Sequence, residues 1–258
     1  MTPRVTGATA LRVLRQLRRD PRTLALVFVV PPLLITLFRY VFNGQPGTFD
    51  RVGGPMVGIF PFTSMFVVTS IAMLRERTTG TLERLMTMPL AKLDILLGYG
   101  LAFAAVAAIQ ASITSAVAFG LLGLSVQGPV ALVIALAVAN AVLGMAIGLF
   151  TSAFARTEFQ AVQFLPAFVF PQLLLCGLIV PRDRMEPVLA AVAKALPLTW
   201  AFDALDRTAV RGETGGAVVR DVVIVVGVTL LALALGATTL RRRTCSPTAS
   251  SPCSPSCT

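Results

Sequence analysis

Histidine is absent from this sequence, and lysine and cysteine are scarce. Histidine is the commonest general base and the commonest metal-binding side chain, so its absence excludes most metalloproteases and haem proteins. The four cysteines, Cys176, Cys245, Cys253 and Cys257, have neither the spacing of a zinc site nor histidine partners. We therefore expect unpaired thiols, as in a reducing cytoplasm, and no metal site.

A phosphate-binding loop is also missing. The pattern G-x-x-x-x-G-K-[ST] does not occur, because the only lysines, Lys92 and Lys194, precede leucine and alanine. The chain is therefore not expected to bind ATP through such a loop. We predict that it has no catalytic residues, binds no cofactor and is not an enzyme by itself.

Charged residues make up only 13% of the chain, against 55% hydrophobic residues, and the mean hydropathy is +0.81. Too little polar surface remains to cover a soluble globule, so we predict an integral membrane protein. A hydrocarbon core about 30 Å thick takes roughly 20 apolar residues per helix. Six runs meet this length, at about 23–42, 55–74, 95–122, 129–154, 159–180 and 218–240. We predict an all-α polytopic domain over residues 1–243, followed by a disordered Ser/Pro tail at 244–258.

The segment before the first run has the pattern of a basic helix that lies in the membrane interface, over residues 5–19. Asp20 and Pro21 then provide an N-cap and a first-turn proline for the first span. No small-x-small cleavage site follows the apolar run, so we expect this start to remain uncleaved rather than to act as a signal peptide. The expected apolar stripe consists of Gly7, Ala10, Leu11, Leu14 and Leu17, with Arg12, Arg15 and Arg19 on the other side.

Positive charge is concentrated on one side of the expected spans. That side holds 14 of the 22 basic residues and 5 of the 12 acidic residues, which gives it a net charge of +9 and leaves +1 elsewhere. Basic residues that flank spans are retained in the cytoplasm, so we expect both termini to be cytoplasmic. The chain is not expected to bind nucleic acid despite its net charge of +10, because no soluble module displays the basic residues. The 14 residues are Arg4, Arg12, Arg15, Arg18, Arg19, Arg22, Arg75, Arg77, Arg84, Lys92, Arg156, Arg241, Arg242 and Arg243.

The longest charged interruption, residues 75–94, separates the second and third runs. Thr79 or Thr81 can cap a short helix there, and the Met88-Pro89 pair would end it. Such a helix has one apolar face and no core to enter, so it either binds a partner protein or rests on lipid headgroups. The apolar face consists of Leu82, Leu85 and Met86, beside Glu83 and Arg84.

The segment at 181–217 is too long for a simple turn. Residues 186–196 are compatible with a helix, Pro197 breaks it, and 198–210 follow with Trp200, the only tryptophan. Two short helices that dip into the outer leaflet fit this pattern, and a plain extracellular loop is the alternative.

Few polar groups lie within the runs. Arg39 either snorkels to the headgroups or contributes to a substrate path or gate. Gly144 and Gly148 form a G-x-x-x-G that lets two helices approach closely, although the motif alone is weak evidence for dimerisation. The uncharged polar residues are expected to join helices to one another; they are Gln110, Ser112, Thr114, Ser115, Asn140, Gln160, Gln163 and Gln172.

The sequence R-E-R-x-x-G-T-L-E-R-L at residues 75–85, together with the basic N-terminal helix and six spans, resembles the permease subunits of type-2 ATP-binding-cassette exporters, in particular the daunorubicin-type drug-resistance branch. The likeness covers about residues 11–243. It implies a coupling helix that enters a cleft of a separate ATPase chain, where ATP and Mg²⁺ bind. The coupling residues would be Gly80, Thr81, Leu82, Glu83 and Leu85, with Met86 on the same apolar face.

The resemblance further implies a homodimer with two ATPase chains in the plasma membrane, and paired outer helices at 186–210. Arg39 and Trp200 would then lie near the outer pathway, although permeases of this family more often have a small or apolar residue at the position of Arg39. We expect export of a lipophilic drug or a lipid-like substrate. The alternative is an ion-coupled secondary transporter or a membrane assembly factor, and the buried acids or inverted repeats that a transporter of that kind needs are not evident.

Overall fold

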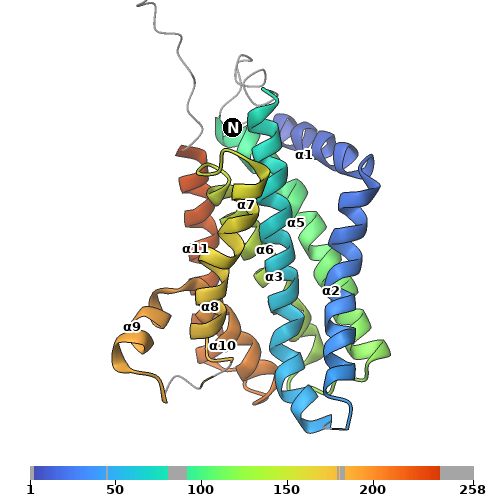
Figure 1. The fold of residues 1–258 in the computed structure, drawn as a ribbon, viewed down its shortest axis with the longest axis vertical. Coiled ribbons are helices and arrows are strands. Elements are labelled where there is room, and N and C mark those ends of the chain that lie inside the picture. Colours follow the sequence, from blue (N-terminus) through green and yellow to red (C-terminus); the bar gives the residue numbers. More distant parts are fainter. Residues whose placement is uncertain (1–2, 45, 81–91, 179, 181–183, 239–258) are drawn as a thin grey trace, which may run out of the picture.

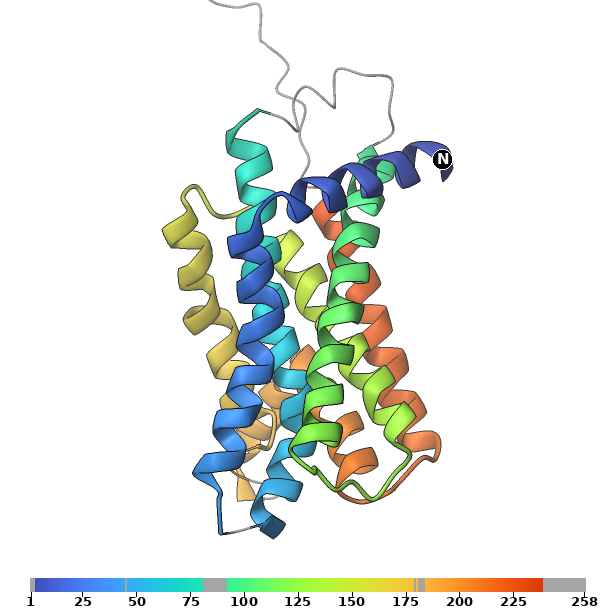
Figure 2. The ribbon, with the colours of Figure 1, turned by 90° about the vertical axis from the view of Figure 1, so that its right-hand side faces the viewer.

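The computed structural model describes residues 3–44, 46–80, 92–178, 180 and 184–238, and within these ranges the chain is helical with no strand. Long helices run side by side along the bundle, and α1 lies across one end of it (Figures 1 and 2). The all-α prediction is confirmed. The elements are α1 (Pro3–Arg18), α2 (Pro21–Val41), α3 (Pro46–Thr78), α5 (Lys92–Ala116), η1 (Val117–Leu121), α6 (Val130–Thr151), α7 (Glu158–Phe164), η2 (Leu165–Val169), α8 (Phe170–Leu175), α9 (Pro187–Ala195), α10 (Pro197–Ala209) and α11 (Gly216–Thr238).

Five helices in the described part of the chain are each long and apolar enough to cross a membrane: α2, α3, α5 continued by η1, α6 and α11. They correspond to five of the six expected spans. Helix α3 begins at Pro46, before the start expected for the second span near residue 55, and its first turns include the charged residues Asp50 and Arg51. The tail at 244–258 lies outside the described residues.

The remaining expected span, 159–180, is helical from Glu158 to Leu175 but changes its winding on the way. It consists of α7, the π-helical turn η2 and α8. Pro166 lies in η2. Because proline has no backbone N–H and its ring crowds the preceding turn, it disfavours regular α-helical winding, and here the wider π turn accommodates Pro166.

Helix α1 meets α2 at a capped corner. The Asp20 carboxylate accepts hydrogen bonds from the Thr23 backbone N–H at 3.2 Å and from the Thr23 hydroxyl at 2.6 Å, and Pro21 is the first residue of α2. The predicted N-cap is therefore confirmed. Of the predicted apolar stripe of α1, Ala10, Leu14 and Leu17 pack against the core and Leu11 is 48% exposed, while Val13, outside that stripe, is buried.

Helices α3 and α6 pack against each other at the centre of the bundle. A Cβ atom on Gly144 would lie 2.2 Å from the Phe62 carbonyl oxygen, and one on Gly148 would lie 2.2 Å from the Thr69 hydroxyl oxygen. Thr69 and Ser70 donate hydrogen bonds across this contact to the Met145 and Gly148 carbonyl oxygens, both at 3.2 Å. The G-x-x-x-G is thus used within the chain, to bring α3 and α6 close together.

At the end of the bundle opposite α1, the pair of short helices expected from the sequence is present (Figure 1). Helices α9 and α10 meet at a bend of 91°. The break falls between Leu196 and Pro197, as the sequence pattern indicated. Most of α10 is buried against α3, α6 and α11, whereas α9 presents Val188 and Leu189 to the surroundings.

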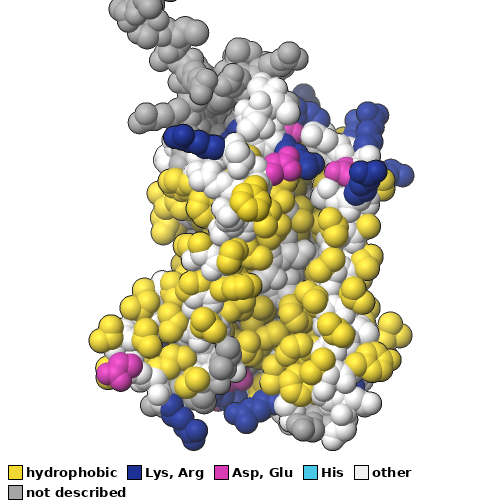
Figure 3. Space-filling view, in the orientation of Figure 1, with side chains coloured by type: hydrophobic (Ala, Val, Ile, Leu, Met, Phe, Trp, Pro, Cys, Tyr) yellow, Lys and Arg dark blue, Asp and Glu magenta, His cyan; other side chains and the backbone are white. Residues whose placement is uncertain are grey.

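The sides of the bundle are apolar, and charged side chains gather at its two ends (Figure 3). Exposed leucine and valine side chains cover the outer faces of α2 and α11, including Leu33 at 60% and Val223 at 64% exposure. Apolar surface of this extent is stable only in contact with lipid or another protein. The chain is therefore an integral membrane protein.

Candidate functional site

The charged motif that begins at Arg75 occupies the C-terminal turn of α3. The Thr79 backbone N–H and hydroxyl both donate to the Arg75 carbonyl oxygen, at 2.9 and 2.8 Å. Gly80 follows with φ of +71°, the left-handed conformation that commonly ends a helix. Thr79 therefore closes α3. The helix that Thr79 or Thr81 was expected to cap lies outside the described residues, so that cap stays a prediction.

Gly80 is the one coupling residue that the structure describes. The other residues predicted for the coupling helix lie outside the described residues, so that helix stays a prediction; they are Thr81, Leu82, Glu83, Leu85 and Met86. The described residues immediately before them nevertheless show how this segment is attached to the bundle.

Arg75 attaches the end of α3 to the first turn of α7. Its Nε donates to Glu158 Oε1 at 2.7 Å, and its Nη2 donates to Glu158 Oε2 at 3.1 Å. Paired N–H donors that match both carboxylate oxygens give a strong and directional contact. The Arg75 guanidinium lowers the pKa of the Glu158 carboxyl below its ordinary value. Both side chains are about half exposed, so solvent weakens the pair.

Glu76, the next residue, is joined to α1 instead. Its Oε1 accepts a hydrogen bond from the Gln16 side-chain amide at 2.8 Å, and Arg12 Nη2 lies 4.0 Å from its Oε2. Arg12 also donates to the Tyr99 hydroxyl on α5 and lies 5.8 Å from the centre of the Tyr99 ring. Adjacent residues of the motif thus hold different parts of the bundle, Arg75 holding α7 and Glu76 holding α1 and, through Arg12, α5.

This arrangement around Glu76 was not predicted from the sequence. Arg12 was placed on the outer face of α1, but it points inward to Tyr99, which is only 1% exposed. The sequence offers one sign of this contact: Glu76 lies at the end of an apolar run, where an acid requires a partner. Nothing in the local sequence identifies that partner, because Gln16 is 60 positions away.

A pocket of about 470 Å³ lies directly below these contacts and is called the α2–α3 pocket here. It opens between α2 and α3 on the face seen in Figure 3. Its charged lining residues, Asp20, Arg75 and Glu76, all lie at the α1 end, and most of the remaining lining is apolar. A concave apolar site with a few polar groups at one end is typical of small-molecule binding sites. The apolar lining includes Leu26, Val30, Leu34, Val67, Val68 and Ile71.

The two residues predicted for the outer pathway lie at the α10 end, each with its own partner. The Arg39 guanidinium lies 5.1 Å from the centre of the Phe49 ring. Trp200 donates its indole N–H to the Lys194 carbonyl oxygen at 2.9 Å, and the Arg220 guanidinium lies 5.3 Å from the centre of its ring. These contacts hold α2 to α3 and join α9, α10 and α11, so both residues have at least a structural role.

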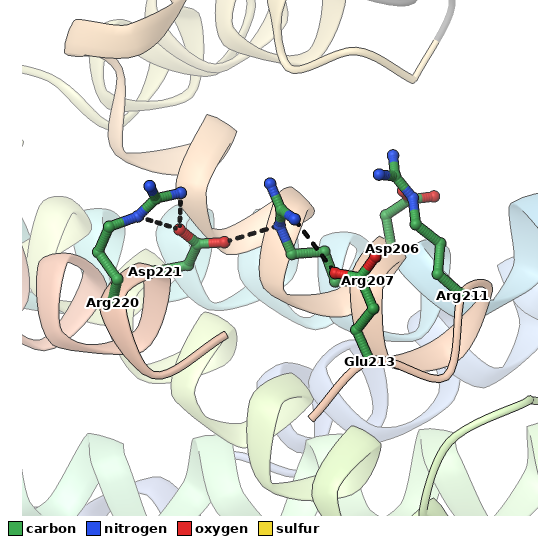
Figure 4. A network of polar contacts seen from close by, with 6 residues as sticks. All are labelled: Asp206, Arg207, Arg211, Glu213, Arg220 and Asp221. Carbon is green, nitrogen blue, oxygen red and sulfur yellow. Dashed lines mark hydrogen bonds and ion pairs between the residues drawn. The ribbon is translucent and has the colours of Figure 1, made fainter. Parts of the chain in front are cut away.

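A network of charged residues joins α10 to α11 near Trp200 (Figure 4). Asp221 is fully buried, with Arg207 Nε 3.3 Å from its Oδ2 and Arg220 Nη2 2.9 Å from its Oδ1. Arg207 also pairs with Glu213 at 3.2 Å. This network was not predicted, although an acid inside the apolar run at 218–240 is the expected sign of such a contact.

Comparison with known proteins gives a consistent assignment. Residues 5–208 match the family described as ABC-2 type transporter. Relatives include ABC transporter G family member 20 of Dictyostelium discoideum, 26% identical over 171 residues, which are 66% of this chain and 23% of the relative. The probable multidrug ABC transporter permease YbhR of Escherichia coli is 28% identical over 130 residues, 50% of this chain and 35% of the relative.

A third relative is the linearmycin resistance permease protein LnrN of Bacillus subtilis, 26% identical over 174 residues. The match covers 66% of this chain and 44% of that protein. The chain therefore spans less than half the length of these three relatives.

Proposed function

Since this chain belongs to the ABC-2 type transporter family, we propose that it is the membrane-spanning permease of an exporter driven by a separate ATPase chain. The ATPase chain would bind ATP and Mg²⁺, and this chain would provide the path across the membrane. The names of two relatives, a probable multidrug permease and a linearmycin resistance permease, support a lipophilic drug or lipid-like substrate. The α2–α3 pocket is of suitable size and lining for one.

The observation that carries this proposal is the double attachment of the motif. Arg75 binds α7 and Glu76 binds α1, at two neighbouring positions just before the segment expected to enter the ATPase. A displacement of that segment would therefore move the end of α3 together with α7 and α1. Packed helices move as rigid bodies in transitions of this kind, so the force would reach the membrane helices without local unfolding.

The α1 end of the bundle is proposed to face the cytoplasm. Of the 14 basic residues assigned to that side, Arg12 lies on α1, Arg75 in the last turn of α3 and Arg156 just before α7, whose Glu158 binds Arg75. The rule that flanking basic residues stay inside then places both termini in the cytoplasm and α9 with α10 at the outer surface. The membrane would be the plasma membrane, where drug efflux acts.

Two copies of the chain and two ATPase chains are proposed for the complete exporter. Helix α2 is exposed along most of its length, as are Phe159, Phe168 and Phe170 on the α7–η2–α8 run. These faces are available to lipids or to a second copy. An ion-coupled transporter is less well supported, because the acid inside the last span, Asp221, is paired with Arg207 and Arg220.

The proposal is tested by reconstitution. The purified chain in liposomes should neither hydrolyse ATP nor move a fluorescent lipophilic drug, and both activities should appear when its ATPase chain is added. Arg75→Ala should lower the amount of drug moved per ATP hydrolysed, because α7 would no longer follow α3. Arg51→Ala, an exposed arginine at the other end of α3, is the matched control. Robust ATP hydrolysis by the chain alone, with contaminants excluded, would contradict the proposal.

A further inference from the structure

Glu76, a buried acid in the α2–α3 pocket, has one carboxylate oxygen that accepts no hydrogen bond in the contacts described above. Glu76 is 6% exposed and lines the pocket. Its Oε1 accepts the Gln16 amide, but its Oε2 accepts no hydrogen bond from the described residues. A carboxylate oxygen has two lone pairs, so one would remain available even if the Tyr99 hydroxyl turned its proton toward it.

The arginines closest to this carboxylate are engaged with other groups. Arg12 donates to the Tyr99 hydroxyl and stays 4.0 Å from Glu76 Oε2, which is too long for a hydrogen bond. Arg75 gives two of its N–H groups to Glu158. Among the residues that line the pocket, the acids are Asp20 and Glu76 and the one base is Arg75. A buried carboxylate without a close, hydrogen-bonded cation is unfavourable, so the site favours an incoming cation.

The rest of the pocket determines what the cation is attached to. Below Glu76 the lining continues along α2 and α3 with Val30, Leu34, Val67 and Val68. A volume of about 470 Å³ holds a hydrocarbon chain or a small set of rings. A neutral N–H or O–H can donate to Glu76 Oε2 but leaves its charge without a close cation, and an anion would meet two carboxylates beside Arg75, which is already paired with Glu158. A molecule with an apolar body and a protonated amine matches both parts of the pocket.

We propose that the α2–α3 pocket binds lipophilic primary or secondary amines, with an ammonium N–H donating to Glu76 Oε2 and the apolar body lying between α2 and α3. The proposal rests on the proposed function, which provides for lipophilic substrates, and it adds their charge class and the residue that selects it. A hydrogen bond between two charged groups is about twice as strong as one between neutral groups. Selection should therefore depend on the charge of Glu76 rather than on its shape.

The experiment is photoaffinity labelling of the purified chain in nanodiscs of neutral lipid, with no ATPase chain present. The probe is an alkyl primary amine with a diazirine on its chain, and the control probe is the same molecule with the amine acetylated. Labelled peptides are identified by mass spectrometry. The variants are Glu76→Gln, which retains the bond to Gln16, and Glu186→Gln, which removes an exposed acid at the opposite end. Ser64→Phe fills the pocket without removing an apolar contact.

The amine probe should label peptides of α2 and α3 about tenfold more than the acetylated probe, an advantage lost in Glu76→Gln and retained in Glu186→Gln. Ser64→Phe should reduce labelling by both probes. If the acetylated probe labels Glu76→Gln as strongly as it labels the parent, the variant keeps its pocket. The proposal is overturned if both probes label the parent equally, if Glu76→Gln labels like the parent, or if a second copy fills the pocket and no lining peptide is labelled. Because the assay contains no ATPase, its outcome is independent of whether the chain supports ATP-driven export.

Discussion

Arg75 and Glu158 are 83 positions apart in the sequence, yet two hydrogen bonds of 2.7 and 3.1 Å join their side chains. The pair connects the last turn of α3 to the first turn of α7. Arg75 lies five positions before Gly80, the first of the predicted coupling residues. The strength of the pair should therefore matter more for coupled motion than for folding.

Acidification should release this pair. The arginine lowers the pKa of the Glu158 carboxyl in the folded state, so the pair's stabilisation is fully present above the unfolded-state pKa of about 4.3 and is lost as the pH falls through the lower folded-state value. Because both groups are half exposed, we expect less than about 1 kcal/mol. A double-mutant cycle of Arg75→Ala and Glu158→Ala, measured by thermal unfolding at pH 7, gives the coupling energy. A coupling energy of several kcal/mol would contradict this view of the pair.

The coupling residues should be dispensable for folding but required for function. Leu82 and Glu83 are expected on a helix that faces water when no partner is bound, so Leu82→Ala and Glu83→Ala should change the free energy of unfolding by no more than about 0.5 kcal/mol. Against the ATPase chain, Leu82 would be a desolvated anchor, whose truncation typically costs more than about 1 kcal/mol of binding. Both variants should reach the membrane at normal levels and lose ATPase association in pull-down assays. Association at the parental level would favour the headgroup-resting helix instead.

Gly144 should not tolerate a side chain. A Cβ at this position would lie 2.2 Å from the Phe62 carbonyl oxygen, so Gly144→Ala must push α3 and α6 apart, at a cost of about 1–3 kcal/mol. Gly227→Ala on α11 is the matched control, since nothing lies within 4 Å of its Cβ position. The comparison is made by the thermal stability of the purified variants in one detergent. Equal stability of the two variants would show that the close packing of α3 against α6 is unimportant.

Asp221 should be needed to hold α10 against α11. Asp221→Asn leaves Arg207 and Arg220 without a charged partner on α11, which should destabilise the chain by about 2 kcal/mol. Limited trypsin digestion should then cut faster at Arg211, in the connection between α10 and α11. Glu186→Gln, which removes an exposed acid outside this network, is the control. Cleavage at the parental rate in Asp221→Asn would mean that apolar packing alone holds α10.

The orientation of the chain in the membrane can be tested by labelling single cysteines from one side. On a cysteine-free background, Arg156→Cys should be protected from an impermeant maleimide added outside intact cells, and Glu213→Cys should react. Both positions are exposed in the structure, so access depends on the side of the membrane and not on burial. The reverse pattern would invert the proposed topology.

Features that depend on neighbours in the sequence could be predicted, and those that depend on distant contacts could not. The Asp20 cap with Pro21 and the break at Pro197 are local, and both are present where expected. Five of the six expected spans followed from composition and length, because every helix in lipid must be apolar over a fixed distance. The π-helical turn η2 was not foreseen, since whether a proline such as Pro166 breaks, kinks or widens a helix depends on the helices packed around it.

The site was predicted only in part for the same reason. The motif at 75–85 indicated a contact with a partner, but not that Arg75 binds Glu158 or that Arg12 turns inward to Tyr99. Those contacts depend on how α1 crosses the end of the bundle (Figure 2). The face of α1 that is buried depends on that crossing, and helical periodicity alone did not indicate that Val13 is buried or that Arg12 turns inward.

The close packing of α3 against α6 determines how far a small movement can reach. With glycines at 144 and 148, the two backbones are in contact and cannot slide or bend independently. From Phe62 to Arg75 α3 contains no proline and spans about 20 Å, so a tilt of about 5° over this segment displaces its end by about 2 Å. The glycine contacts lie on this same segment, so α3 and α6 would act together as a stiff lever between Arg75 and the interior prolines Pro55 and Pro61.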